Sequence, residues 1–236
     1  MNNFGRKMSN EGNHIIHNLI ILDESGSMAS LKRQTLEGIA SVFTTIRDGM
    51  EKFPEQDHRI SLLSFASGRS SSANHKFILW NEPVDNIPVN FANAYRPDGG
   101  TPLYDAIGAG LAKMRADLAS QSPDSYNVLV TIITDGEENS STEYSYEQIR
   151  KLIGTLSEGN WTFAFIGAGL DAYDVARRLN IGNALAFIPD ENGVKDLFMR
   201  TKIANERYMA SIRMPSSKSF SSKITGLFDE DKVEKQ

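Results

Sequence analysis

Three short stretches of the sequence carry carboxylates or hydroxyls in patterns suited to holding a metal ion. The first is Asp23-x-Ser25-x-Ser27, in which Gly26 allows a tight turn. It directly follows the apolar run Leu19–Leu22, which is typical of a strand buried on both faces of a parallel sheet. Carboxylate and hydroxyl oxygens are hard donors, so the stretch favours magnesium or manganese over zinc.

Two later stretches carry the same kinds of donor. Gly99-Gly100-Thr101-Pro102 opens a predicted helix, and Thr134-Asp135-Gly136 ends a predicted buried strand. Ligands of α/β proteins bind where the carboxyl ends of the strands meet, so we expect the three stretches to converge at one edge of a sheet. The predicted metal site has two carboxylates and three hydroxyls: Asp23, Ser25, Ser27, Thr101 and Asp135.

Strands and helices alternate along the chain, which predicts a three-layer α/β/α fold with a mostly parallel sheet. Strands are predicted at residues 14–23, 59–66, 76–80, 127–134, 161–166 and 184–188. Helices are predicted at residues 30–53, 101–118, 144–156, 171–179 and 193–214. The connection before the third strand is short and rich in turn residues, which predicts a hairpin and an antiparallel edge strand.

Composition narrows the class of protein. The 236 residues suffice for one domain, and no apolar run has the length of a membrane span. A net charge of −5 argues against a nucleic-acid partner. Zero cysteines exclude disulfides and thiolate sites, and with the polar N-terminus they favour a cytoplasmic location. We expect a flexible leader at residues 1–13 and a flexible tail at residues 214–236.

Together and in this order, the three stretches resemble the metal-ion-dependent adhesion site of von Willebrand factor type A (vWA) domains. The resemblance covers residues 14–213. It implies the Rossmann-like vWA fold and a site in which Ser25, Ser27 and Thr101 supply hydroxyls to Mg²⁺ or Mn²⁺. Asp23 and Asp135 are then expected to hold the ion directly or through water.

The resemblance also implies a function. It indicates a binding module rather than an enzyme, in which the ion bridges to an Asp or Glu of a protein partner. The run of residues 99–106 looks like that of stand-alone vWA proteins of bacteria and phages, including tellurite-resistance-like members. Such proteins imply partners such as AAA+ ATPases or components of stress and defence systems.

Other functions fit parts of the pattern. Asp23 could be the nucleophile of a metal-dependent phosphohydrolase, although Ser25 stands where those enzymes carry their acid/base carboxylate. The ion could also serve only to stabilise a scaffold. The run Gly167-Ala-Gly-Leu-Asp-Ala172 fits G-x-G-x-x-A, which indicates either a dinucleotide site or simply a tight strand-to-helix turn.

Several of these residues also have purely structural interpretations. Ser25, Ser27 and Thr101 could be helix caps, and Asp135-Gly136 could be a turn. Glu137 and Glu138 are either rim residues of the site or solvated acids, and Asp105 either orients a ligand or favours the first turn of its helix. His14 and His17 are expected to be partly exposed at the start of the chain's first strand.

Overall fold

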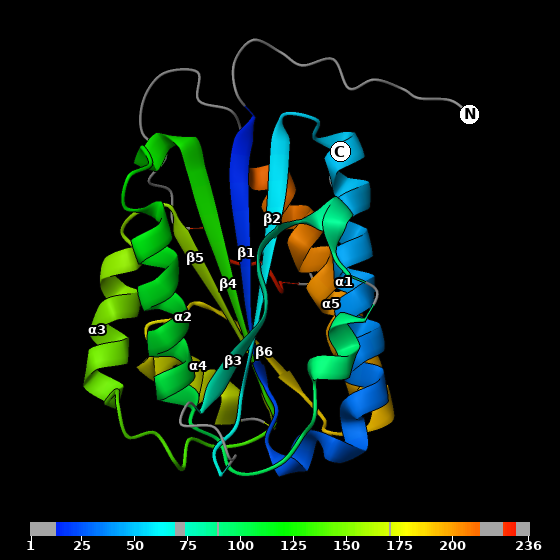
Figure 1. Cartoon of the computed structure of the whole chain (residues 1–236), viewed down its shortest axis with the longest axis vertical. Coiled ribbons are helices and arrows are strands. Elements are labelled where there is room, and N and C mark those ends of the chain that lie inside the picture. The colour runs from blue at the N-terminus through cyan, green and yellow to red at the C-terminus, as the bar shows by residue number, and fades with distance from the viewer. Residues whose placement is uncertain (1–12, 69–73, 89, 170, 213–223, 230–236) are drawn as a thin grey trace.

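The fold is a single six-stranded sheet between two layers of helices (Figure 1). The computed structural model describes residues 13–68, 74–88, 90–169, 171–212 and 224–229. The strands are β1 His14–Asp23, β2 Gln56–Phe65, β3 His75–Pro83, β4 Tyr126–Thr134, β5 Trp161–Ala168 and β6 Asn183–Phe187. The helices are α1 Lys32–Lys52, α2 Leu103–Leu118, α3 Tyr146–Leu156, α4 Asp171–Arg178 and α5 Glu191–Ser211.

The strand order is β3-β2-β1-β4-β5-β6, and only the β2–β3 pairing is antiparallel within the described chain. The predicted fold class, with its antiparallel edge strand, is therefore confirmed. Helices α2, α3 and α4 cover one face of the sheet, and α1 and α5 cover the other (Figure 1). No helix in the described ranges has the length and apolar character needed to cross a membrane.

The central strand β1 shows why the sheet has two apolar faces. Leu19 and Ile21 pack with the α2 side, while Ile20 and Leu22 pack with the α1 side. Successive side chains of a strand point to opposite faces, so an unbroken apolar run serves both layers. The strand therefore ends, fully buried, at the carboxylate of Asp23.

Some element boundaries differ from the predicted ones for local reasons. Residues Gly26–Leu31 form a short 3₁₀ helix, so α1 starts later than predicted. Ser145 caps α3 and exchanges hydrogen bonds with Gln148, which sets the start of that helix at Tyr146. Strand β2 begins at Gln56, three residues before the predicted start, and Gln56 and His58 are buried there.

Two expectations about exposure are wrong. His14 and His17 are buried, with 6% and 3% of their surface exposed. Within the predicted flexible tail, Leu227 is buried and its neighbours Ile224 and Phe228 pack against the same cluster, which includes Tyr208 of α5. Three apolar residues in six give this segment a face to bury, so it belongs to the core. The predicted leader and the rest of the tail lie almost entirely outside the described residues.

Candidate metal centre

The predicted site residues lie at one edge of the sheet, where β1 and β4 end side by side. The two strands pair in parallel with Leu22 opposite Ile133, which brings Asp23 and Asp135 to neighbouring strand ends. Strands β2 and β3 lie on one side of β1, and strands β4, β5 and β6 lie on the other. The strand order therefore reverses between β1 and β4. Ligands of open α/β sheets bind at such a point. In Figure 1 it is at the lower end of β1.

The hydroxyls and carboxylates of the first and third stretches are in direct contact. The Ser27 hydroxyl donates to Asp135 Oδ1 at 2.6 Å, and the Ser25 and Ser27 hydroxyl oxygens lie 3.0 Å apart. The second stretch reaches the same place, because a Cβ added to Gly136 would lie 3.2 Å from the Thr101 hydroxyl oxygen. The structure thus brings together all five predicted residues, from three segments distant in sequence.

Asp23 is held from both sides of its carboxylate. The Ser25 backbone N–H donates to Oδ1 at 2.7 Å, and the Thr134 hydroxyl donates to Oδ2 at 2.6 Å. Burial nevertheless raises its pKa from 3.8 to about 6, against these hydrogen bonds and with some help from the charge of Asp135. Burial also raises the pKa of Asp135. A site that penalises two carboxylates in this way would gain by receiving a cation between them.

The capping interpretation does not account for the hydroxyls. Ser25 precedes the 3₁₀ helix without capping it through its side chain. Pro102, not Thr101, is the residue before α2, and no side-chain cap is present there. The Ser25, Ser27 and Thr101 hydroxyls are thus free of the structural task that would otherwise explain their presence.

Residues behind the site position Thr101 and the loop after β4. Asn139 Oδ1 accepts the Thr101 N–H at 2.9 Å. Glu138 accepts the N–H groups of Tyr104, Ser140 and Ser141 at 2.7–2.9 Å. Glu138 is therefore not simply a solvated acid, because its carboxylate accepts three backbone N–H groups and so shapes this loop. Nothing in the sequence pattern marks Asn139.

Asp105 has a similar role, one turn further along α2. It is buried, and its carboxylate accepts the N–H groups of Thr142, Glu143 and Tyr144 at 2.8–2.9 Å. The helix start and the 138–144 loop are thus joined by two acidic side chains. Asp105 acts on the loop behind Thr101, and its carboxylate hydrogen bonds go to this loop rather than to any of the five predicted ligands.

The donor set suits a hard divalent cation. Two carboxylates carry −2 against the +2 of the ion, and the three hydroxyls are neutral oxygen donors. Among the residues that the structure describes, no three His, Cys, Asp or Glu side chains gather for a metal. To hold such an ion, the site therefore needs its three hydroxyls beside its two carboxylates. Ser27 is exposed and Asp135 partly so, which leaves the group open to solvent.

A hollow of about 550 Å³ adjoins the site and shares Thr134 and Asp135 with it. Its lining also includes Gly167 and Ala172, the first and last residues of the G-x-G-x-x-A stretch. Its charged lining is mostly acidic: Asp135, Glu137, Glu138, Asp171 and Asp174, against Arg178. These charges oppose a dinucleotide's phosphates. A larger hollow of about 830 Å³, near α3 and β6, contains none of the five site residues.

The glycines of that stretch have structural reasons of their own. A Cβ on Gly167 would lie 2.7 Å from the Ala172 Cβ, so the residue allows α4 to pack closely on β5. Gly169 has a φ of +72°, which L residues rarely adopt. The tight-turn interpretation explains both residues.

Comparison with known proteins agrees with this fold. The family model described as von Willebrand factor type A domain matches residues 19–200. A search of the curated proteins found no match.

Solved structures with similar folds share little sequence with the chain. The VWA domain of SpRpn10 superposes with a TM-score of 0.53 at 11% identity, over 78% of this chain and 94% of that one. The pilus adhesin SpaC of Lactobacillus rhamnosus GG gives 0.61 at 14% identity, over 87% of this chain and 31% of the adhesin. Proximal thread matrix protein 1 of the mussel byssus, solved with a zinc-occupied MIDAS motif, gives 0.55 at 12%, over 82% and 48%. The chain thus spans less than half of the latter two proteins, and the likeness concerns the fold.

Proposed function

Because the chain belongs to the von Willebrand factor type A family, we propose that it is a protein-binding module that works through a divalent cation. The family's domains commonly mediate protein interactions. The ion, Mg²⁺ or Mn²⁺, would be held by Asp23, Ser25, Ser27, Thr101 and Asp135. An Asp or Glu of the partner would complete its coordination.

One contact carries the proposal: the 2.6 Å hydrogen bond from the Ser27 hydroxyl to Asp135, between loops 108 residues apart. It joins the donor sets of two loops at the solvent-open edge of the sheet. Mg²⁺ seldom receives all six of its ligands from protein and usually keeps several waters. An ion held here would therefore keep a position that a partner's carboxylate can take.

The donor balance favours an acidic partner. Two carboxylates balance the +2 of the ion, and the three hydroxyls add no further negative charge. The solvent-open side of the ion can therefore still accept a carboxylate from a partner. Catalysis is not part of the proposal, because Ser25 occupies the place where a phosphohydrolase of this type would need its acid/base carboxylate. The mussel protein of similar fold, solved with a zinc-occupied MIDAS motif, supports a divalent cation as the kind of ligand. The hard donors of this chain favour Mg²⁺ or Mn²⁺.

The proposal extends to context, where its support is the sequence resemblance alone. We place the vWA module at residues 14–213, in the cytoplasm of a bacterium or a phage-infected cell. A partner from an AAA+ ATPase or a stress or defence system would then offer the acidic residue.

The test is a pull-down from the source cell's lysate with four baits or conditions. Wild type is used in Mg²⁺ and in EDTA, and the Ser25→Ala/Ser27→Ala variant in Mg²⁺. A matched Ser122→Ala/Ser125→Ala variant removes two serines at the opposite edge of the sheet, where the Ser125 hydroxyl only donates to the Ser122 carbonyl. Circular dichroism checks that both variants are folded.

A protein captured by wild type and by the matched control in Mg²⁺, but absent from the other two samples, is the expected result. A protein captured in all four would favour a scaffold with recognition on another face. A generic aryl-phosphate assay is run in parallel, and turnover that Asp23→Asn abolishes would replace the proposal with a phosphohydrolase.

A further inference from the structure

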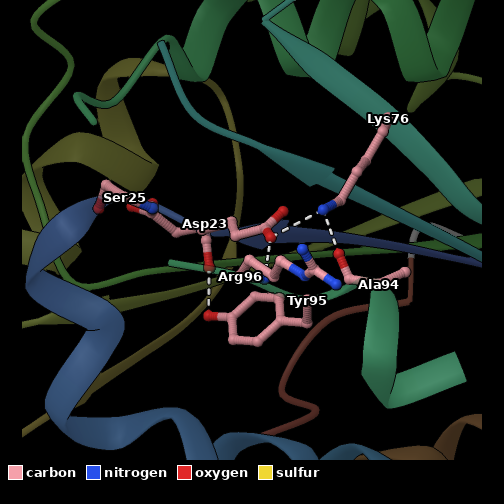
Figure 2. A network of polar contacts seen from close by, with 7 residues as sticks. Asp23, Ser25, Lys76, Ala94, Tyr95 and Arg96 are labelled. Carbon is pink, nitrogen blue, oxygen red and sulfur yellow. Dashed lines mark hydrogen bonds and ion pairs between the residues drawn. The ribbon is translucent and has the colours of Figure 1, made fainter. Parts of the chain in front are cut away.

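Glu24 stands between two proposed metal ligands and is fully buried. Its side chain meets Lys76 of the edge strand β3, with 2.8 Å between Lys76 Nζ and Glu24 Oε1. The same oxygen accepts the Arg96 backbone N–H, and Lys76 also donates to the Ala94 carbonyl (Figure 2). The Glu24–Lys76 pair therefore joins three segments: the 23–27 loop, the edge strand β3 and residues 94–96.

Segment 94–98 also donates hydrogen bonds to backbone carbonyls of the 23–27 loop. The Tyr95 hydroxyl donates to the Asp23 carbonyl at 2.7 Å (Figure 2), and the Asp98 N–H donates to the Glu24 carbonyl at 2.9 Å. Just beyond it, the Gly26 N–H donates to the Gly99 carbonyl at 2.9 Å. This segment leads within three residues to Thr101, the hydroxyl donor of the second stretch.

We propose that Glu24 and Lys76 are positioning residues of the metal site. Their ion pair clamps segment 94–98 against the 23–27 loop and so fixes the Thr101 hydroxyl relative to those of Ser25 and Ser27. The inference rests on the proposed function, since it concerns the ion's affinity. It adds that the edge strand β3, which supplies none of the five ligands, helps determine that affinity.

The pair has a second effect on the donor balance. Lys76 holds the Glu24 carboxylate on the β3 side, so the ion meets two carboxylates and not three. If the pair acted only through its charges, Lys76→Met would strengthen cation binding and Glu24→Gln would weaken it. Positioning predicts a different result, because either substitution releases segment 94–98 and weakens binding.

The experiment measures Mn²⁺ affinity by titration, following free Mn²⁺ by electron paramagnetic resonance well below the melting temperature. We expect both Lys76→Met and Glu24→Gln to bind Mn²⁺ at least about 10-fold more weakly, as is typical when an outer residue that orients metal ligands is lost. Lys76→Arg keeps a cation opposite Glu24 and should restore most of the affinity. A role in stability alone would lower the melting temperature and leave these affinities unchanged.

Two further variants keep the test sound. Lys52→Met removes a lysine at the far end of α1 that pairs with Glu206 of α5, away from the site and from β3, and should leave Mn²⁺ affinity unchanged. Tyr95→Phe removes only the hydroxyl that donates to Asp23 and changes no charge. It should weaken Mn²⁺ binding several-fold even if a charge variant fails to fold.

The outcomes separate the inference from the function on which it rests. Weaker binding by both charge variants and by Tyr95→Phe supports the clamp. Opposite changes in the two charge variants, or unchanged affinity in all three, overturns it while the metal site stands. No Mn²⁺ binding by wild type overturns the site and the clamp together.

Discussion

The two ends of β1 both carry buried polar side chains, yet they do different things. At the carboxyl end, Asp23 and Ser25 meet hydroxyls and a second carboxylate at an open edge. At the amino end lies a cluster of histidines and amides that we call the amino-terminal polar cluster: His14, His17, Asn18, Gln56 and His58. Burial alone therefore does not mark a site; the kind of donor and the access of solvent do.

Apart from His17, the members of the amino-terminal polar cluster form hydrogen bonds within the protein. His14 Nε2 lies 2.7 Å from Asn127 Oδ1, and His58 Nδ1 lies 3.2 Å from Asn18 Nδ2. Gln56 Nε2 donates to the carbonyls of Met209 and Ile212 at 2.9 and 3.0 Å, which fastens the end of α5 to the sheet. This cluster has no carboxylate, so it serves packing rather than a cation.

The two ends also respond to acid in opposite directions. The raised pKa of Asp23 means that the folded chain binds this proton more tightly than the unfolded chain, so its contribution favours folding at low pH and is lost as the pH rises through about 6. Burial lowers the pKa of His17 and of His58 from 6.5 to about 4. The unfolded chain binds these protons more tightly, so stability is lost as the pH falls from 6.5 towards 4.

The largest expected effect comes from Asp23→Asn at the carboxyl end. Removing a ligand should weaken Mn²⁺ binding by at least about 100-fold, beyond the usual cost of losing an outer residue. In EDTA at pH 7.5 the same change should stabilise the fold by about 3 kcal/mol, because it removes a charge whose pKa burial has raised by about 2. Titration and urea unfolding measure the two effects. If the variant were less stable than wild type without metal, the buried charge of Asp23 would not be destabilising the metal-free fold, and the prediction would be wrong.

The next effect tests the amino end with Gln56→Leu. The change leaves the carbonyls of Met209 and Ile212 without their buried donor, which should cost about 3 kcal/mol of unfolding free energy. Mn²⁺ affinity should stay within about 2-fold of wild type, since Gln56 lies at the opposite end of the sheet from the proposed ligands and shares no partner with them. A large loss of Mn²⁺ affinity would mean that the two ends are coupled.

His17→Leu should remove one of the two acid-sensitive groups. The His17 ring makes no hydrogen bond of ordinary geometry among the described residues and has only a weaker contact with Asn81, so at pH 7.5 we expect stability within about 1 kcal/mol of wild type. At pH 4.5 the variant should be more stable by about 2–3 kcal/mol, because wild type must expel a proton from this side chain to fold. Urea unfolding in EDTA at both pH values measures the difference in unfolding free energy between the variant and wild type. An equal difference at pH 7.5 and pH 4.5 would show that His17 does not contribute to the acid sensitivity.

The sequence predicts the carboxyl end better than the amino end, for a physical reason. The unbroken apolar run that stops at Asp23 identifies the strand end, and the types of donor that follow it identify the chemistry. At the amino end the polar Gln56 and His58 hide the start of β2, because the groups that satisfy Gln56 lie 153 and 156 residues away. Hydropathy registers that a residue is polar but not that a distant partner permits its burial.

The same limit applies within the site. The five donors are recognisable by type and spacing, whereas Glu24 occupies a position that the motif leaves open. Its partner Lys76 lies 52 residues further along, on the edge strand. A sequence pattern specifies the proposed ligands, whereas the side chains that position those ligands can be recognised only from the arrangement of the strands.

The smallest expected effect concerns Thr134, which supports the site without being a proposed ligand. Its hydroxyl donates to Asp23 Oδ2 at 2.6 Å, so Thr134→Val removes one of the two hydrogen bonds that hold the Asp23 carboxylate. We expect Mn²⁺ binding to weaken about 10-fold. Thr131→Val makes the same change three residues earlier on β4, at another buried threonine, and should leave Mn²⁺ affinity unchanged. Equal losses of Mn²⁺ affinity in both variants would show that the packing of β4, rather than the orientation of Asp23, governs the affinity. The contrast between the carboxyl end of β1 as a binding site and its amino end as a packed cluster would then be wrong.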